Sequence, residues 1–281
     1  MVEEFEQRRL KALNAQITGS TKLVGIVGTP VDQLKSPGVW NPLFERYSVD
    51  AAFLPFDVPT EAFDRVMSGL KALSNIRGLM ITMPHKFAAV RHADKLSSQS
   101  KHIGAISMMR RSSDGSWIGD SCEAQAVLTA LGKTTFEPKG VDAFLIGAGG
   151  AGQVIAWALA LAGAASVVIH DVNRGRAEDL ARRISSSTSC RASYGENDPS
   201  QCDLVINATP TGMSELDPLP TDVERFAKSA IVLDMIADPS PTRFLQHASL
   251  RGHQIVDGLT VLQATVPVFA EFLGLGSGWD R

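Results

Sequence analysis

Hydrophobic and polar positions divide the chain into short β-like runs separated by segments of helical spacing. In the first half, β-rich runs cover 22–27, 51–56 and 78–82, and residues 61–73 carry apolar side chains at helical spacing. A second block opens near residue 139 and repeats the alternation. Its predicted strands are 141–146, 166–171, 204–207 and 231–234, and its predicted helices are 151–162 and 177–184. This alternation predicts an α/β fold with a doubly wound parallel sheet.

The remaining segments connect or extend these elements. We predict an N-terminal helix over 5–15, a turn over 113–116, a helix over 123–131 that ends at Gly132, a surface connection over 185–201 around one short strand, and a C-terminal helix over 260–273. Pro267 falls inside the last of these, which indicates a kink or a late start.

A glycine motif follows the strand predicted over 141–146. Gly147-x-Gly149-x-x-Gly152 joins that strand to a helix, and Asp171 ends the next strand, 19 residues after Gly152. Glycines permit a tight turn and a close approach of backbone amides to a pyrophosphate, and an acid roughly 20 residues later binds the ribose. The glycines could instead only pack a helix against a strand. Because motif, strand and acid coincide, we predict a dinucleotide site formed by Gly147, Ala148, Gly149, Gly150, Ala151 and Gly152.

Asp171 bears on which dinucleotide binds. A carboxylate there accepts hydrogen bonds from a ribose diol and repels a 2′-phosphate, so we expect NAD. Arg174 and Arg176 follow closely and keep NADP as an alternative, although the helix that starts there could direct both side chains to solvent.

Composition narrows the function classes. The chain has 281 residues, of which 44% are hydrophobic and 20% charged, as is typical of a folded protein, and its length suits two domains. Its formal charge of −3 indicates no basic surface for nucleic acid or an anionic membrane. Its three cysteines complete no disulfide framework and show no metal-binding spacing, so we expect a reducing cytoplasm and no metal. Residues 143–169 are uncharged and long enough to span a bilayer, but the glycines favour a strand, a turn and a buried helix. The acidic N-terminus indicates no signal peptide.

Several motifs occur in the order found in one family. They are Gly28-Thr29-Pro30-Val31 with Lys35-Ser36-Pro37, Thr82-Met83-Pro84-His85-Lys86, Ile103-Gly104-Ala105, the glycine motif, the run from Asn207 to Met213, Leu233-Asp234-Met235, and Asp257-Gly258-Leu259. On these residues, from about 22 to 274, the chain resembles the shikimate dehydrogenase family. The resemblance implies a substrate domain over 1–122, a Rossmann domain over 123–258, and a C-terminal helix over 259–281 that returns to the first domain.

The resemblance also implies roles for individual residues. Lys86 would be the general acid/base and Glu123 its partner, although Lys86 could be a solvated lysine and Glu123 a favourable helix opener. His85 is expected to be structural or solvent-facing. The residues expected to bind the small-molecule substrate are Ser36, Thr82, Ser107 and Gln263, with Thr265 as the alternative to Gln263. The further residues expected to bind the dinucleotide are Asn173, Arg174, Asn207, Ala208, Thr209, Pro210, Met213 and Gly258. Met213 would contact nicotinamide or belong to the core.

The chain departs from the family at several polar positions. Leu34, Met80, Met108 and Ala237 replace polar residues expected in relatives, and Glu123 replaces an aspartate. A site that loses hydrogen-bonding partners binds a polyhydroxylated ring less well. We therefore expect either weak activity on shikimate or quinate, or a less hydroxylated carboxylate as substrate. A non-catalytic NAD-binding sensor is the alternative from another class, the motifs disfavour a folate-type dehydrogenase, and a homodimer stays open.

Overall fold

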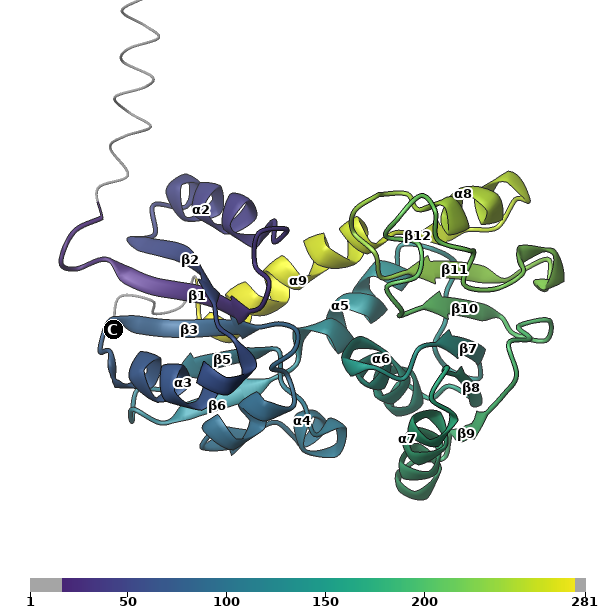
Figure 1. Cartoon of the computed structure of the whole chain (residues 1–281), viewed down its shortest axis with the longest axis horizontal. Helices are drawn as coiled ribbons and strands as arrows, with labels where there is room; N and C mark the ends of the chain where they lie inside the picture. The colour runs from purple at the N-terminus through teal and green to yellow at the C-terminus, as the bar shows by residue number, and fades with distance from the viewer. Residues whose placement is uncertain (1–16, 276–281) are drawn as a thin grey trace, which may run out of the picture. The chain divides into compact units, whose positions relative to one another are not determined.

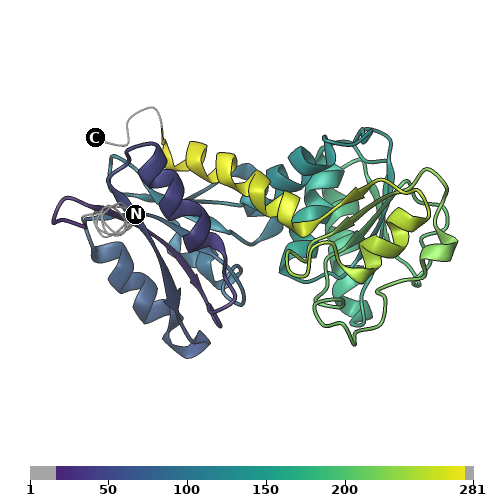
Figure 2. The same cartoon turned by 90° about the horizontal axis from the view of Figure 1, so that it is seen from above.

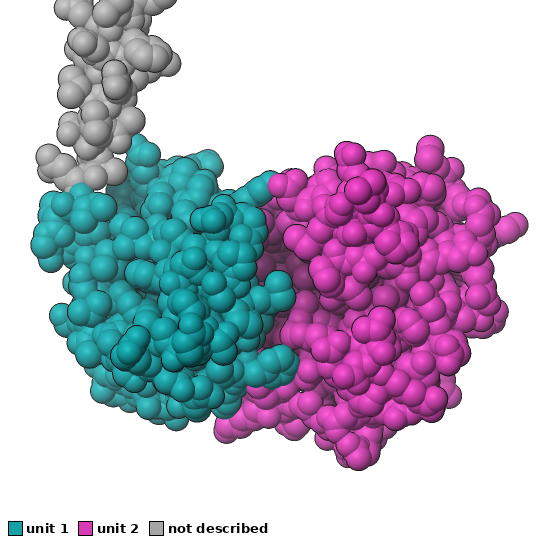
Figure 3. All heavy atoms as spheres, in the orientation of Figure 1, with its two compact units in different colours: residues 1–97, 106–120, 281 teal, residues 98–105, 121–280 magenta. Residues whose placement is uncertain are grey.

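The chain forms two compact units. The structure is a computed structural model and describes residues 17–275. Among these residues, unit 1 comprises 17–97 together with Ile106–Asp120, and unit 2 comprises Ser98–Ala105 together with 121–275 (Figure 3). The helix predicted over 5–15 lies outside the described residues.

Unit 1 contains a six-stranded sheet in the order β2-β1-β3-β5-β6-β4. Its strands are β1 (Lys22–Gly28), β2 (Ala51–Asp57), β3 (Ile76–Ile81), β4 (Lys95–Leu96), β5 (Met108–Arg111) and β6 (Trp117–Asp120). The first three strands are parallel, whereas β5 and β6 form an antiparallel hairpin beside β3. The turn of that hairpin covers the predicted 113–116.

Two helices cover opposite faces of the sheet of unit 1 (Figures 1 and 2). Helix α3 (Phe63–Ala72), preceded by the 3-10 turn η1 (Thr60–Ala62), places Phe63 and Met67 in one core cluster with Leu79 of β3. On the other face, helix α2 (Ser36–Arg46) packs through Trp40, whose ring stacks on that of Phe53 at a centroid distance of 6.0 Å. The helix predicted over 61–73 is thus stabilised as α3, because its apolar residues lie on one face and pack on the side chains that the strands direct to that side of the sheet.

Unit 2 contains a second six-stranded sheet, in which every strand pair is parallel. Its strands are β7 (Asp142–Ile146), β8 (Ser166–His170), β9 (Arg191–Tyr194), β10 (Leu204–Asn207), β11 (Ile231–Asp234) and β12 (Ile255–Val256), in the order β12-β11-β10-β7-β8-β9. In chain order this is 3-2-1-4-5-6, the doubly wound Rossmann arrangement. The predicted fold class is confirmed.

Helices cover both faces of this sheet, so its central strands are continuous apolar runs rather than alternating ones. One face packs on α5 (Cys122–Leu131), α6 (Gly150–Leu161), α7 (Arg174–Ser187) and α9 (Gly258–Leu273). The other packs on α8 (Arg243–Leu250) and the 3-10 turn η3 (Val223–Arg225) (Figure 1). All residues of β10 and β11 are buried. None of the helices described between residues 17 and 275 is long and apolar enough to cross a bilayer.

Two predicted boundaries shift. Helix α7 begins at Arg174 rather than at Ala177, because the Asn173 side chain caps it by accepting a hydrogen bond from the Arg176 amide. At its other end, α7 also includes Ser185–Ser187, the first residues of the predicted connection.

The division into units also differs from the predicted domains at one segment. The sequence placed residues 98–105 in the first domain, whereas helix α4 (Ser98–Ile103) groups with unit 2 because Ile103 and Ala105 are buried in that unit's core. Helix α9 also groups with unit 2. Its return to unit 1 stays a prediction.

Candidate active site

The glycine motif forms a tight loop at the carboxyl end of β7. Gly147 has φ +100°, and a Cβ on it would lie 3.0 Å from the carbonyl oxygen of Ala208, which follows β10. A Cβ on Gly152 would lie 1.9 Å from the carbonyl oxygen of Gly147. Only hydrogen fits at either position. The loop therefore packs against the end of β10, where the strand order reverses and ligands of doubly wound sheets bind.

Gly149 differs from these two glycines. It caps the N-terminus of α6, and a Cβ on it would meet no atom within 4 Å. The fold has room for a side chain there, so packing does not account for this glycine, whereas a ligand that approaches the backbone would. The amides of the first helical turn, Gly150 and Ala151 among them, have no intrahelical partners and form an anion-binding end.

Asp171 lies at the end of β8 and is only 6% exposed. Its carboxylate accepts hydrogen bonds from the amides of Ala148 (2.6 Å) and Asn173 (2.7 Å) and from the Arg176 guanidinium (2.8 and 3.0 Å). Burial raises the pKa of the Asp171 carboxyl, but the bonds from Arg176 and the two amides outweigh it and hold the pKa below its ordinary value. The carboxylate is ionised at neutral pH and holds the glycine loop.

The two arginines near Asp171 take different positions. The expectation that both could point to solvent is wrong for Arg176, whose guanidinium pairs with Asp171 because α7 starts early enough to bring it round. Arg174 is exposed, pairs with Glu178, and lies over the ring of Tyr194. The cap at Asn173 was the sequence signal that would have placed Arg176 correctly.

The ends of β10 and β11 carry a second polar network. The Asn207 amide donates to Asp234 (3.0 Å) and to the Thr211 carbonyl (3.1 Å), and its oxygen accepts from the Thr209 hydroxyl (2.7 Å). Burial raises the pKa of Asp234, although bonds from Thr242, the Ile236 amide and Asn207 oppose the effect. This network holds the loop that follows β10, which includes Ala208 and Pro210.

Two predicted dinucleotide residues flank this network. Met213 is 55% exposed, which rules out the core alternative for it. A Cβ on Gly258 would lie 2.3 Å from the carbonyl oxygen of Ile236, so glycine is needed where α9 starts beside the end of β11.

In unit 1, backbone hydrogen bonds gather the predicted residues at one edge of the sheet. The Thr29 amide donates to the Met83 carbonyl (3.0 Å), the Ile81 amide to Ser107 (2.7 Å), and the Ile106 amide to the Lys86 carbonyl (3.0 Å). A Cβ on Gly28 would lie 2.3 Å from Thr82 Cγ2, which explains that glycine. Thr82, Lys86 and Ser107 are therefore brought close together, and Ser36 is buried at the start of α2.

His85 is structural. It is 1% exposed, its Nε2–H donates to the Val58 carbonyl (2.6 Å), and its ring stacks on Phe63 at 4.2 Å. Its solvent-facing alternative is wrong, and the imidazole anchors the turn that carries Lys86.

Two of the departures from the family pattern lie side by side. Met80 of β3 pairs directly with Met108 of β5, and both are buried. Residues opposite each other in an antiparallel pair share a face of the sheet, so the two thioethers form one apolar surface. Its face is opposite to that of Leu79, which packs on α3. Leu34 lies half-buried in unit 1, and Ala237 half-buried in unit 2.

The remaining predicted residues belong to unit 2. Glu123 opens α5 and accepts a hydrogen bond from the Ser121 hydroxyl (3.1 Å). Gln263 is exposed on α9, whereas Thr265 is buried and donates to the Leu262 carbonyl (2.6 Å). Because Lys86 belongs to unit 1, its pairing with Glu123 stays a prediction.

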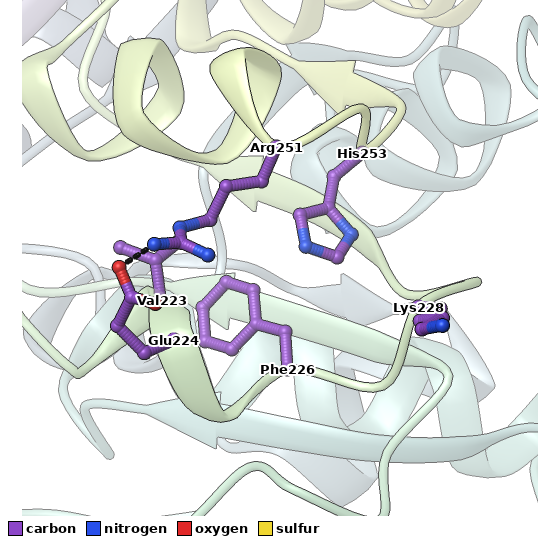
Figure 4. A pocket seen from close by; sticks show the side chains of 6 residues that line it. All are labelled: Val223, Glu224, Phe226, Lys228, Arg251 and His253. Atoms are coloured by element: carbon purple, nitrogen blue, oxygen red, sulfur yellow. Dashed lines mark ion pairs between the residues drawn. The ribbon is translucent and has the colours of Figure 1, made fainter.

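A surface hollow of about 520 Å³ lies elsewhere in unit 2 (Figure 4). It is lined by Val223, Glu224, Phe226, Lys228, Arg251 and His253, and Arg251 pairs with Glu224 across it. Lys228 and His253 precede β11 and β12, so the hollow faces the amino ends of these parallel strands, opposite to the glycine loop. None of the predicted site residues line it. Among residues 17–275, no cluster of His, Cys, Asp and Glu side chains is arranged to hold a metal.

Known proteins of one family are similar to this chain. Residues 26–109 match the family model described as shikimate dehydrogenase substrate binding domain. The chain is 33% identical to the shikimate dehydrogenase (NADP(+)) of Desulforamulus reducens over 259 residues, which cover 89% of this chain and 88% of the relative.

Two solved structures are similar over most of their length. One is shikimate 5-dehydrogenase from Listeria monocytogenes in complex with shikimate and NAD, with a TM-score of 0.85, 27% identity, and coverage of 94% of this chain and 96% of that one. The other is ligand-free 5-ketofructose reductase of Gluconobacter, with a TM-score of 0.83, 29% identity, and coverage of 91% and 93%.

The fold and the glycine loop define an oxidoreductase with a Rossmann domain. The chain belongs to the shikimate dehydrogenase family.

Two glycine substitutions separate ligand binding from packing. Gly149→Ala leaves the free energy of unfolding within about 0.5 kcal/mol of the wild type but weakens NAD binding by at least about tenfold, because its methyl group occupies the space a pyrophosphate needs. Gly152→Ala lowers the free energy of unfolding by about 1–3 kcal/mol, since its methyl group collides with Gly147. Denaturant unfolding and fluorescence titration measure the two effects. Unchanged NAD affinity in Gly149→Ala would contradict the assignment of the loop.

Proposed function

We propose that this protein is an NAD(P)-dependent dehydrogenase that catalyses reversible hydride transfer between nicotinamide and the secondary alcohol of a cyclic hydroxy acid of the shikimate or quinate type. The observation that carries the proposal is the glycine loop. It is closed by contacts that admit no Cβ at Gly147 or Gly152, open at Gly149, and tied to Asp171. Membership of the shikimate dehydrogenase family supports the same activity.

Lys86 is the general acid/base in this proposal. Oxidation of an alcohol requires removal of the hydroxyl proton as hydride leaves carbon, and an amine held by the turn after β3 can accept it at Nζ. Bound nicotinamide supplies the hydride acceptor. Glu123 orients the Lys86 ammonium, and Ser36, Thr82, Ser107 and Gln263 hold the polar groups of the substrate.

The apolar pair Met80 and Met108 bears on which substrate is used. Two thioethers replace polar side chains on one face of the sheet, so hydroxyl groups directed at them lose hydrogen bonds that they keep in water. A less hydroxylated carboxylate is therefore the alternative substrate. The similarity to a 5-ketofructose reductase is consistent with a scaffold that serves more than one alcohol.

NAD is the preferred cofactor in this proposal. Asp171 is the acid at the end of β8, the position at which such folds bind the adenosine ribose, and it is ionised although it is buried and paired with Arg176; Val172, 99% exposed, adds no cation for a 2′-phosphate. The curated relative is named for NADP, whereas the Listeria structure holds NAD. NADP stays the alternative cofactor, because the Arg176 guanidinium places a cation beside Asp171.

A cytoplasmic location completes the proposal, and the homodimer stays open. The three cysteines are buried and unbridged, which suits a reducing compartment.

Replacing the amine of Lys86 tests catalysis. Lys86→Met lowers kcat by roughly 10²–10⁴-fold while the Kd of NAD is unchanged, because the proton acceptor is lost and the glycine loop is intact. Lys95→Met removes a lysine of the same unit that is paired with Asp114, and serves as the control. Steady-state kinetics and NAD titration measure both variants. Equal rates in the two variants would remove Lys86 from the mechanism, and a wild type that binds NAD but oxidises no hydroxy acid would favour the sensor.

Restoring one polar group tests the substrate. Leu34→Ser restores a polar side chain where the family pattern expects one, and a hydrogen bond from its hydroxyl to the substrate carboxylate raises kcat/KM for shikimate roughly ten- to hundredfold. Leu250→Ser, 88% exposed and in unit 2, is the control. Efficient turnover of shikimate by the wild type at a micromolar KM would contradict the expectation that its substrate site binds shikimate weakly.

Neutralising Asp171 tests the cofactor. Asp171→Asn removes the charge that holds Arg176 and repels a 2′-phosphate, so the ratio of NADP to NAD affinity rises by at least about tenfold. Separate titrations with the two dinucleotides measure the ratio. An unchanged ratio would show that Asp171 does not face the ribose.

A further inference from the structure

Helix α4 departs from unit 1 and returns to it within a short stretch of chain. Residues 98–105 group with unit 2, where Ile103 and Ala105 are buried in the core, and the chain re-enters unit 1 at Ile106. Ile106, which is buried in the core of unit 1, is thus joined to α4 by only Gly104 and Ala105.

Arg183 of α7 holds the end of α4. Its Nη2 donates to the carbonyls of His102 (2.8 Å) and Ile103 (3.1 Å). The last carbonyls of a helix lack partners inside the helix, and a cation there also interacts favourably with the helix dipole. One guanidinium thus donates hydrogen bonds to two carbonyls at the end of α4 and attaches α4 to α7.

The same guanidinium reaches toward the glycine loop. Its Nη1 donates to Gln153 Oε1 (3.3 Å), and Gln153 Nε2 donates to the carbonyl of Ala148 (3.3 Å). Ala148 lies between the first two glycines of the motif, and its amide donates to Asp171. Gln153 therefore connects this loop to Arg183 by two hydrogen bonds.

Beyond α4 the connection continues to Lys86. Gly104 turns the chain with φ +72°, a conformation that glycine adopts without strain. Two residues later the Ile106 amide donates to the Lys86 carbonyl (3.0 Å), and the adjacent Ser107 carbonyl accepts from Ile81. The segment that leaves α4 therefore holds the backbone of Lys86.

We propose that Arg183 is a positioning residue that links the glycine loop, through Gln153 and α4, to the backbone of Lys86. A dinucleotide in the loop then restrains α4 and with it the lysine. The inference rests on the proposed dinucleotide site and on the role of Lys86, and Arg183 itself contacts neither substrate nor nicotinamide in this account.

Kinetics of paired arginine variants test the link. Arg183→Met lowers kcat by roughly 2- to 30-fold, the range of energetic coupling through such networks, while the Kd of NAD changes by less than about threefold. Arg183→Lys restores part of the rate, because an ammonium replaces the guanidinium fork at one carbonyl only. Arg182→Met is the matched control, since Arg182 is exposed on the same helix and pairs with Asp179.

Hydrogen exchange supplies a readout that a purely structural role would not move. In the wild type, ADP-ribose slows exchange of the Ile106 and Ser107 amides, whereas Arg183→Met and Gln153→Leu lose this ligand-dependent protection with their melting temperatures retained. Identical kcat and exchange in Arg183→Met and Arg182→Met would overturn the inference, and so would ligand-dependent protection that survives in both linkage variants. A wild type that binds no NAD would overturn the proposed function as well, whereas binding without protection overturns the inference alone.

Discussion

The structure of unit 2 depends on one close approach between two backbones. Gly152 lies so near the carbonyl of Gly147 that no side chain fits between them, and a Cβ on Gly147 would in turn lie 3.0 Å from the carbonyl oxygen of Ala208 after β10. This contact lets α6 begin directly over the end of β7 and draws the ends of β7 and β10 together. It also places the Ala148 amide, between the first two glycines, where it donates to Asp171.

Much of the fold could be predicted because it depends on local patterns. The buried runs that became β10 and β11 have the same boundaries in sequence and structure, since both strands are covered on two faces and end at polar residues. The start of α7 was misplaced because apolar spacing sets the buried face of a helix, whereas the Asn173 side chain sets its first turn.

Contacts between distant residues were harder to predict. Spacing identified Asp171 as an acid at the end of a strand, but the bond from Arg176 depends on where a helix begins. The attachment of α4 to unit 2 depends on a guanidinium 80 residues further along the chain, and no periodicity signals it. The adjacency of Met80 and Met108 likewise required the register of two strands. Positions could be inferred from motifs, whereas partners needed the fold.

The proposed reaction needs a dinucleotide bound by the glycine loop of unit 2 and Lys86 of unit 1 to act on the same substrate carbon. Transfer of deuterium from NADH that carries deuterium at both C4 positions to the carbonyl carbon of 3-dehydroshikimate, or of a less hydroxylated keto acid, tests this reaction most directly by mass spectrometry. The account predicts one deuterium on the carbinol carbon for each NADH consumed. Tight binding of NADH with no label in any product would contradict it.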